Sequence, residues 1–331
     1  MVPETFRDLM RLGHGFEAAK IFMLAVEHDF FTPLEQESDA AELARLRGLD
    51  RRAVGLCLNA LAALGILEKS QGRFRNGAAA SRWLVQGANY RGHIFKHIHH
   101  CWDAWHRLDQ VLHDGRPAEV AEDQALGGDE KHTRNFIRGM DDVTRELAPA
   151  VVAGLNLEGV RSVLDVGGGP GRYAQTFLET HPHLEQVVLF DLPGALEVAS
   201  ENLAEFAARD KVKLHPGDLH VDEFGEGVDM VWVSQVLHSL DEEGCQTLLA
   251  KTKRCLNPGG QLMIHEFLLD DDCAGPPQAA LFAVHMLVMT AGGRAYSGAE
   301  IVKWLAELGF VDVRIEVAGP ETRIVSGRLP T

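Results

Sequence analysis

The residues with the clearest chemical potential in this sequence are an acid and a group of glycines. Residues 162–173 read SVLDVGGGPGRY, so a short apolar run leads into a glycine-rich loop and then a helical stretch. Because glycine has no Cβ and tolerates positive φ, the backbone N–H groups of such a loop can approach a ligand closely. The spacing is not a dinucleotide fingerprint, since Arg172 stands where G-x-G-x-x-G needs its third glycine, and it is not a P-loop.

The pattern that remains is D-x-G-x-G-x-G, starting at Asp165. It resembles motif I of the class I methyltransferases that use S-adenosyl-L-methionine. That cofactor carries an ammonium, a carboxylate and a ribose instead of a pyrophosphate, so an acid next to bare backbone N–H groups suits it. A tight strand-to-helix turn without a ligand is the alternative for a glycine loop taken alone.

Acidic residues also follow the next two predicted strands, in Phe190-Asp191-Leu192 and in Gly217-Asp218-Leu219. Ligands of open α/β sheets bind at the carboxyl ends of the strands. We therefore expect Asp191 to accept hydrogen bonds from ribose hydroxyls and Asp218 to lie near an adenine amino group, with Leu219 as an apolar wall. One such acid alone is more often a surface or capping residue, but three at successive strand ends favour a binding site.

His238 follows the fourth predicted strand and Glu266 follows the fifth. A hydroxyl that receives a methyl group must lose its proton, and a histidine that titrates near neutrality can take it. We expect Glu266 to accept a hydrogen bond from the other imidazole nitrogen and so to fix the tautomer. The alternative for His238 is a structural histidine at a helix cap.

The elements that would position these residues alternate between strand and helix from Arg161 onward. This alternation predicts a parallel sheet with crossover helices. After a helix at 298–308, the strands 311–317 and 322–326 form an antiparallel hairpin around Ala318-Gly319-Pro320-Glu321. The parallel strands are expected at 162–166, 186–190, 211–214, 228–233 and 261–267.

The first part of the chain predicts a different arrangement. A helix at 9–31 precedes one at 40–47 capped by Ser38 and one at 51–64 capped by Asp50, and a hairpin follows around a Gln-Gly turn. Two helices and a hairpin form a winged-helix pattern. Its arginines could contact DNA, or the module could serve packing and dimerisation, which the acidic composition favours. The arginines in question are Arg45, Arg47, Arg51 and Arg52.

Two further helices are expected at 90–115 and 136–149. His93 and His97 are one helical turn apart and could chelate a metal, but no acidic or cysteine ligand joins them at helical spacing, so we expect no metal. The expected domains are 1–90, 91–155 as a helical connector lining the substrate pocket, and 156–331 as the cofactor-binding domain.

Composition excludes several function classes. The net charge of −16 and the pI near 5.4 oppose sequence-independent binding to nucleic acid or to an anionic membrane. The first residues have no apolar signal core, and no run approaches the roughly 20 apolar residues of a membrane span. Five scattered cysteines without a C-x-x-C pair fit reduced thiols, so we expect a cytoplasmic protein.

Longer motifs make the resemblance more specific. From about Leu12 to Arg328 the chain resembles the small-molecule O-methyltransferases of the caffeate and acetylserotonin type. The matching motifs are LDVGGGPG (164–171), FDLPG (190–194), GDL (217–219), LHSLDEEGC (237–245), PGG (258–260) and AGGRAYS (291–297).

The resemblance implies a Rossmann-like class I methyltransferase sheet with a terminal antiparallel hairpin, joined to a mainly α-helical N-terminal winged-helix domain that forms a homodimer. It implies S-adenosyl-L-methionine as cofactor, a small hydroxylated aromatic or polyketide-like acceptor, His238 as general base and Glu266 as its assistant. The implied acceptor-pocket residues are Trp105, Phe136, Met140, Met286 and Thr290. The expected cofactor-binding residues are Asp165, Gly167, Gly168, Gly169, Asp191, Leu192, Asp218, Leu219, Ser234 and Gln235.

The chain departs from the family pattern at three places. Ala295 stands where the family often has a second glutamate, Leu240 replaces the tryptophan after the histidine, and Ser234 replaces a lysine. Two alternatives therefore stay open beside O-methylation. One is the same fold and cofactor with C- or N-methylation, hydroxylation or decarboxylation, and the other is a winged-helix regulator that senses a ligand.

Overall fold

The computed structural model describes residues 2–117 and 130–331, and within that part every side chain except those of residues 130–132. The chain folds into two compact units, Met1–Trp102 and Asp103–Thr331. The expected connector 91–155 is thus divided between the two units. Within the described ranges, no helix has the length and apolar character needed to cross a membrane.

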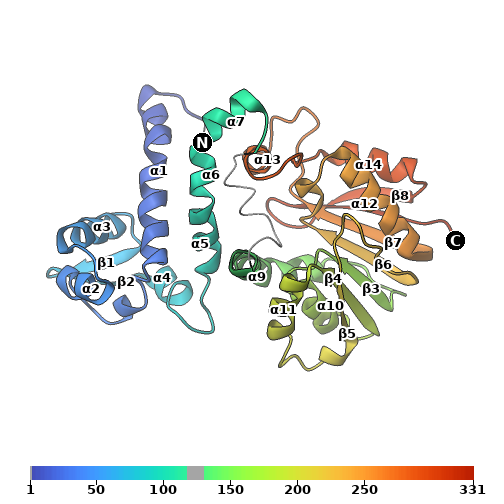
Figure 1. Cartoon of the computed structure of the whole chain (residues 1–331), viewed down its shortest axis with the longest axis horizontal. Coiled ribbons are helices and arrows are strands. Elements are labelled where there is room, and N and C mark those ends of the chain that lie inside the picture. Colours follow the sequence, from blue (N-terminus) through green and yellow to red (C-terminus); the bar gives the residue numbers. More distant parts are fainter. Residues whose placement is uncertain (1, 118–129) are drawn as a thin grey trace. The chain divides into compact units, whose positions relative to one another are not determined.

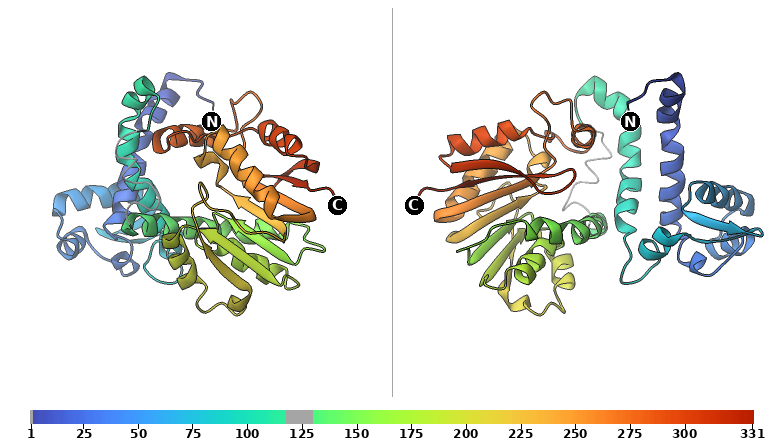
Figure 2. Two further views of the ribbon diagram at one scale, coloured as in Figure 1. Left: turned by 45° about the vertical axis from the view of Figure 1, so that its right-hand side comes forward. Right: turned by 180° about the vertical axis from the view of Figure 1, so that it is seen from behind.

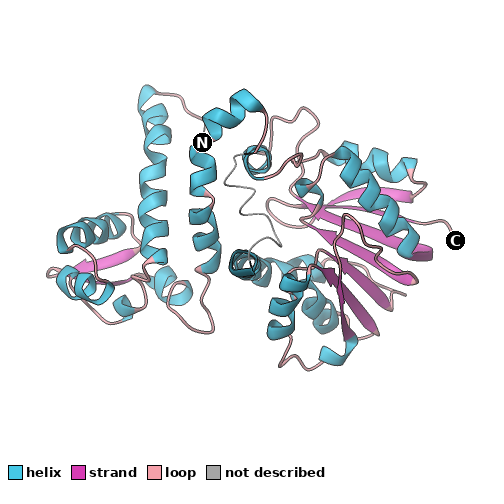
Figure 3. Cartoon of the chain, viewed as in Figure 1, coloured by secondary structure: helices cyan, strands magenta, loops and turns pink. Residues whose placement is uncertain are grey.

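The first unit is mainly helical, with one small hairpin (Figure 3). Its apolar core contains Phe31, Leu34, Leu43, Leu58 and Leu61, all almost completely buried. In chain order its elements are α1 (Phe6–Glu27), η1 (Pro33–Glu35), α2 (Ala40–Arg47), α3 (Arg51–Ala63), β1 (Leu67–Ser70), β2 (Arg73–Asn76), α4 (Ala78–Trp83) and α5 (His93–His100). The two expected helices and the hairpin around the Gln-Gly turn are confirmed.

One predicted helix cap in this unit is wrong. Asp39, and not Ser38, caps α2: its carboxylate accepts the N–H groups of Ala41 and Glu42, and Glu42 accepts the N–H of Asp39 in return. A carboxylate favours a helix N-terminus because it satisfies free N–H groups and complements the helix dipole. Asp50 caps α3 as expected.

The single helix expected at 90–115 is also wrong. Turns at Cys101 and Arg107 divide this stretch into α5, α6 (Trp102–His106) and α7 (Leu108–Asp114). In the second unit, Ala104 and Val111 are buried against Val288 of α13 (Pro277–Met289). The shorter helices α6 and α7 thereby pack against α13, which carries part of the candidate site.

The second unit is a seven-stranded sheet in the order β5-β4-β3-β6-β7-β9-β8 (Figure 1). The strands from β5 to β7 pair in parallel, and β9 pairs antiparallel with both β7 and β8. Figure 2 shows the terminal hairpin along one edge of this sheet. The strands are β3 (Ser162–Val166), β4 (Gln186–Asp191), β5 (Val212–Pro216), β6 (Val228–Ser234), β7 (Leu256–Glu266), β8 (Val311–Val317) and β9 (Arg323–Arg328).

Side-chain alternation along the strands separates the core into two layers. Leu164 and Val166 of β3 belong to one apolar cluster, and Val163 belongs to the other. The first cluster includes side chains of α12 (Glu242–Cys255) and α14 (Gly298–Glu307), and the second includes side chains of α9 (Glu130–Ala153), α10 (Arg172–Thr180) and α11 (Pro193–Asn202). A parallel sheet covered by helices on both faces is the predicted class I methyltransferase architecture.

Candidate active site

The loop after β3 has a backbone that only glycine adopts easily. Gly167, Gly169 and Gly171 have φ of +67°, +51° and +76°. A Cβ on Gly167 would lie 2.7 Å from a methyl of Val236, and one on Gly168 would lie 2.7 Å from the Asp165 carboxylate. Around Gly169 there is open space instead. The loop is therefore packed on its inner side and open at Gly169.

Asp191 connects the end of β4 to this loop. One carboxylate oxygen accepts the Gly169 N–H at 2.8 Å and the other accepts the Leu192 N–H at 2.7 Å. Burial raises the pKa of Asp191, while these two hydrogen bonds favour its charged form. Asp191 and Leu192 thus lie beside the glycine loop, with the Asp191 side chain half-buried.

Asp165 lies beneath the loop, with only 1% of its surface exposed. Burial, with a smaller contribution from the nearby Asp191 charge, raises the pKa of Asp165 to about 8. Among the described residues, its Oδ2 atom has no hydrogen-bond partner. A buried carboxyl without a partner is costly, and it is stabilised when a proton or a cationic group balances it.

The segment after β5 is held by a residue that the sequence patterns did not identify. The buried ammonium of Lys251, on α12, donates to the carbonyl oxygens of Leu219, His220 and Asp222 at 2.9, 3.2 and 2.9 Å. Asp218 accepts the N–H of His220 at 2.8 Å. The only sequence signal for Lys251 is its place on the apolar face of α12.

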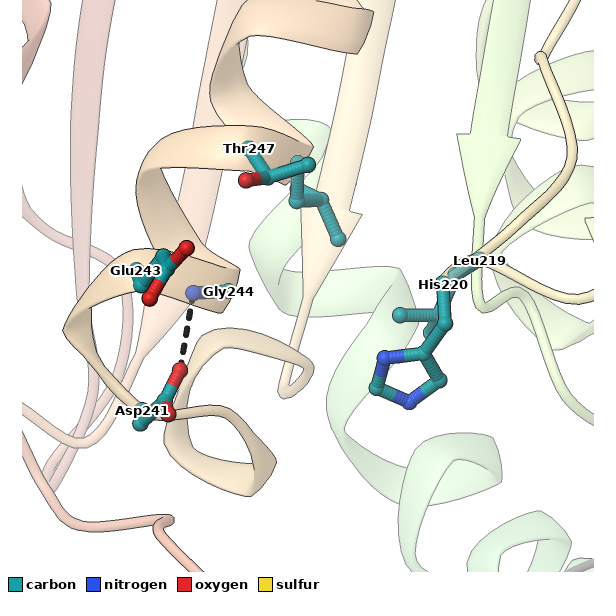
Figure 4. A pocket seen from close by; sticks show the side chains of 7 residues that line it. Leu219, His220, Asp241, Glu243, Gly244 and Thr247 are labelled. Carbon is teal, nitrogen blue, oxygen red and sulfur yellow. Dashed lines mark hydrogen bonds between the residues drawn. The ribbon is translucent and has the colours of Figure 1, made fainter.

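A cavity of about 260 Å³ lies between this segment and the first turn of α12. Leu219 and His220 line one side, and Asp241, Gly244 and Thr247 line the other (Figure 4). Leu240, which stands where the family has an aromatic residue, is buried in the core beside α12.

Two polar residues follow β6. Gln235 is a non-glycine residue in the left-handed region, with φ of 58°, and its backbone N–H donates to the His265 carbonyl at 2.9 Å. Its Nε2 is buried and, within the described part of the chain, without a hydrogen-bond partner. The Ser234 hydroxyl hydrogen-bonds to Nδ1 of His265 at 2.9 Å. Left-handed non-glycine backbone of this kind concentrates at functional sites.

His238 and Glu266 meet as predicted. Nδ1 of His238 lies 2.8 Å from one carboxylate oxygen of Glu266, and the other oxygen accepts the Leu237 N–H at 2.9 Å. A carboxylate only accepts, so Nδ1 carries the proton and Nε2 keeps its lone pair. The Phe282 ring packs edge-on against the imidazole, with centroids 4.7 Å apart. Nε2 is therefore the imidazole nitrogen left to contact a ligand, and 14% of the His238 side chain is exposed.

The predicted acceptor-pocket residues lie on three different helices. Met286 is buried on α13, and the Thr290 hydroxyl that follows it donates to the Met286 carbonyl and accepts the Gly293 N–H. Phe136 and Met140 are half-buried on α9. Trp105 on α6 donates its indole N–H to Nδ1 of His285 at 2.9 Å. Sequence reasoning missed His285, whose only signal is its place next to Met286.

These residues fit S-adenosyl-L-methionine. The open side of the loop at Gly169, the Asp191 carboxylate and the Gln235 amide, whose Nε2 is unpaired among the described residues, provide oxygen acceptors and N–H donors for a ligand with an ammonium, a carboxylate and ribose hydroxyls. Across residues 2–117 and 130–331, no three histidine, cysteine, aspartate or glutamate side chains converge as a metal site.

Comparisons with known proteins identify the family of the chain. Residues 105–311 match the model of the O-methyltransferase domain family. The chain is 33% identical to a 3-hydroxy-5-methyl-1-naphthoate 3-O-methyltransferase of Streptomyces sahachiroi, covering 94% of this chain and 92% of that protein. It is 30% identical to the tetracenomycin polyketide synthesis 8-O-methyl transferase TcmO of Streptomyces glaucescens, covering 98% and 96%.

The fold also resembles that of a solved methyltransferase structure. The crystal structure of human N-acetylserotonin methyltransferase in complex with SAM superposes with a TM-score of 0.89 at 22% identity, covering 100% of this chain and 99% of that chain. That likeness concerns the fold, whereas the family match spans more than half of the sequence. On the family match and the two bacterial relatives, the chain belongs to the S-adenosyl-L-methionine-dependent O-methyltransferases.

Proposed function

We propose that this protein methylates a hydroxyl group of a small aromatic or polyketide acceptor, with His238 as the general base. The observation that carries the proposal is the pair formed by His238 and Glu266. The carboxylate holds the proton on Nδ1, so Nε2 is free to accept the proton of an acceptor hydroxyl. The two bacterial relatives act, by their names, on a naphthoate and in polyketide synthesis, which supports an acceptor of this class.

The cofactor is S-adenosyl-L-methionine, which supplies a methyl group activated by its sulfonium when bound. We propose that it is held at the carboxyl ends of the parallel strands. The residues proposed to hold it are Asp165, Gly167, Gly168, Gly169, Asp191, Leu192, Asp218, Leu219, Ser234 and Gln235. The packing of the glycine loop and the hydrogen bond from Gly169 to Asp191 support this assignment.

We propose that the acceptor binds against α13, near His238. Apolar and aromatic side chains there suit an aromatic ring, and Phe282 packs against the base. Trp105, Met286, Thr290, Phe136 and Met140 are the proposed pocket residues. Ala295 is buried among Leu269 and Ala279, so apolar packing occupies the place of the second family glutamate. The hydrogen bond between Glu266 and His238 is present although the second glutamate is replaced, and this supports O-methylation over altered chemistry.

We also propose that the chain forms a homodimer through its winged-helix-like first unit. Phe6, Leu9, Met10, Leu12 and Phe16 of α1 are each between 45% and 77% exposed. An apolar surface of this kind on one helix is typical of an interface.

The alternative of a DNA-binding regulator would use the arginines of the first unit. One of them, Arg47, already has partners within the fold, since its guanidinium donates to the Asp29 carbonyl and carboxylate at 2.6 and 2.7 Å. These contacts count against Arg47 as a DNA contact.

The proposal is tested first by titrating the protein with S-adenosyl-L-methionine in a calorimeter and then by assaying methyl transfer to a panel of phenols and naphthols. His238→Ala should lower kcat by about 10²- to 10⁴-fold, because a general base contributes about that much, and should keep cofactor affinity. His28→Ala, an exposed histidine of the first unit, is the control. Absence of cofactor binding would refute the proposal, and unchanged turnover of His238→Ala would remove His238 from the mechanism.

A further inference from the structure

His285 is a second histidine beside the proposed base, and the proposed function does not use it. It lies on α13, between Phe282 and Trp105. Phe282 packs edge-on against His238 at 4.7 Å and tilted against His285 at 5.8 Å. The Trp105 ring stacks nearly parallel to His285, with an interplanar angle of 18°. The two imidazoles therefore flank the same phenylalanine.

The hydrogen bond to Trp105 determines the tautomer of His285. An indole nitrogen can only donate, so Nδ1 of His285 must accept and its proton must be on Nε2. Among the described residues, Nε2 of His285 has no hydrogen-bond partner. Burial, and to a smaller extent the electrostatic effect of the nearby His238, lower the pKa of His285, so the ring stays neutral. It then presents one N–H and no positive charge.

The two rings have opposite tautomers. Nε2 of His238 is bare and can accept the proton of a hydroxyl, whereas Nε2 of His285 is protonated and can only donate. A half-buried donor without a protein partner is stabilised when a ligand oxygen accepts its hydrogen bond.

We infer that His285 is a specificity residue: its Nε2–H donates to a second oxygen of the acceptor, a carbonyl or carboxylate oxygen on the ring system that carries the methylated hydroxyl. Trp105 is then a positioning residue, because it acts through the tautomer of His285. The inference rests on the proposed function and narrows its acceptor class to hydroxyarenes with a hydrogen-bond-accepting oxygen.

The test compares two matched series of acceptors. One series is the positional isomers of hydroxynaphthoic acid with the corresponding hydroxynaphthaldehydes, which separate carboxylate from carbonyl recognition. In the other series, each naphthol carries a methyl group in place of the carboxylate or aldehyde group. The wild-type enzyme should prefer at least one member of the first series over its methyl counterpart by about 10- to 100-fold in kcat/KM, since a donor that a bound ligand shields from water but does not pair costs about that much.

Variants then separate recognition from packing. His285→Leu should lose this preference, measured as the ratio of kcat/KM between the two series, because the Nε2–H donor is gone. The variant also removes the acceptor of the Trp105 indole N–H, but that loss acts on both series alike and leaves the ratio unchanged. His285→Gln, whose amide can place an N–H near the position of Nε2, should restore part of the preference. Equal losses on both series, or no restoration by glutamine, would overturn the inference.

A spectroscopic measurement checks the tautomer without turnover. The imidazole ¹⁵N shifts of His285 should show the Nε2–H form in the wild type and a mixture of tautomers in Trp105→Phe, which keeps an aromatic ring and removes the donor. A wild-type ring protonated on Nδ1 would contradict the inference. Equal turnover of the two acceptor series would also overturn it, whereas failure to methylate any member of either series would count against the proposed function itself.

Discussion

At the scale of single residues, the site depends on which atoms carry protons. Glu266 uses both carboxylate oxygens, one for the Leu237 N–H and one for Nδ1 of His238. The first bond places the carboxylate and the second selects the tautomer. The same logic makes the amide variant of Glu266 informative, because an amide has one acceptor and one donor.

Glu266→Gln should lower kcat by about 10²- to 10⁴-fold and leave cofactor affinity within about twofold. The amide oxygen is needed by the Leu237 N–H, so the amide N–H₂ faces Nδ1 of His238 and forces the proton onto Nε2, where it blocks the base. Steady-state kinetics and calorimetry measure both quantities. Glu158→Gln, an exposed carboxylate, is the control, and a wild-type kcat for Glu266→Gln would show that the carboxylate does not set the tautomer.

A second prediction concerns the buried acid Asp165 in the absence of cofactor. Its native pKa is about 8, and a pKa of about 3.9 is expected in the unfolded chain. The folded protein therefore holds the proton more tightly, so this contribution to stability is complete below about pH 4 and is lost as the pH rises through about 8.

Asp165→Asn should remove this dependence. Between about pH 5 and about pH 7.5, its free energy of unfolding should rise relative to the wild type by up to about 1.4 kcal/mol per pH unit. Urea unfolding of both proteins at the two pH values measures the difference. A difference that stays constant, or that moves in favour of the wild type, would mean that Asp165 is ionised in the folded protein.

At the scale of elements, the glycine loop must pack closely against the sheet and also leave space for a ligand. Gly167 and Gly168 have no room for a side chain, whereas Gly169 has the required backbone and open space around it. A methyl group at Gly169 meets no protein atom within 4 Å. A substitution there can therefore disturb ligand binding without a clash inside the fold.

Gly169→Ala should weaken the affinity for S-adenosylhomocysteine at least about tenfold and lower the free energy of unfolding by only about 1 kcal/mol, the usual cost of an alanine in left-handed backbone. Gly48→Ala is a matched control, since Gly48 has φ of +67° and open space at the end of α2. It should show the same loss of stability with unchanged affinity. Equal affinities of the two variants for S-adenosylhomocysteine would show that the cofactor does not bind beside Gly169.

At the scale of the whole molecule, a single chain does not explain the exposed apolar side of α1. Leu12 is 73% exposed and Phe16 is 56% exposed. The net charge of −16 opposes non-specific association, so a contact between copies needs a specific apolar surface.

The double variant Leu12→Glu, Phe16→Glu should shift the protein from dimer to monomer in sedimentation velocity experiments, because the interface would bury charges. Val317→Glu, at an equally exposed apolar position on β8, should leave the dimer unchanged. A wild-type protein that sediments as a monomer would refute the proposed homodimer. A double variant that remains dimeric would show that the interface does not involve this side of α1.

Much of the fold followed from the order of residues alone. The strand Ser162–Val166, the crossover pattern and the terminal hairpin have local signals: apolar runs, glycine punctuation and turn residues within a few positions of each other. The pairing of His238 with Glu266 was also predictable, because the ends of adjacent parallel strands meet at one edge of a sheet.

Other features were decided only by tertiary structure. Trp105 and His285 are 180 residues apart, and Lys251 reaches carbonyl groups about 30 residues away. No periodicity or spacing in the sequence indicates such hydrogen bonds. They form because α6 packs on α13 and because α12 packs against the segment that follows β5. The sequence by itself determined which elements form and which strand ends carry polar groups. Folding determined which polar atoms pair with each other, because such pairs join residues far apart in the chain.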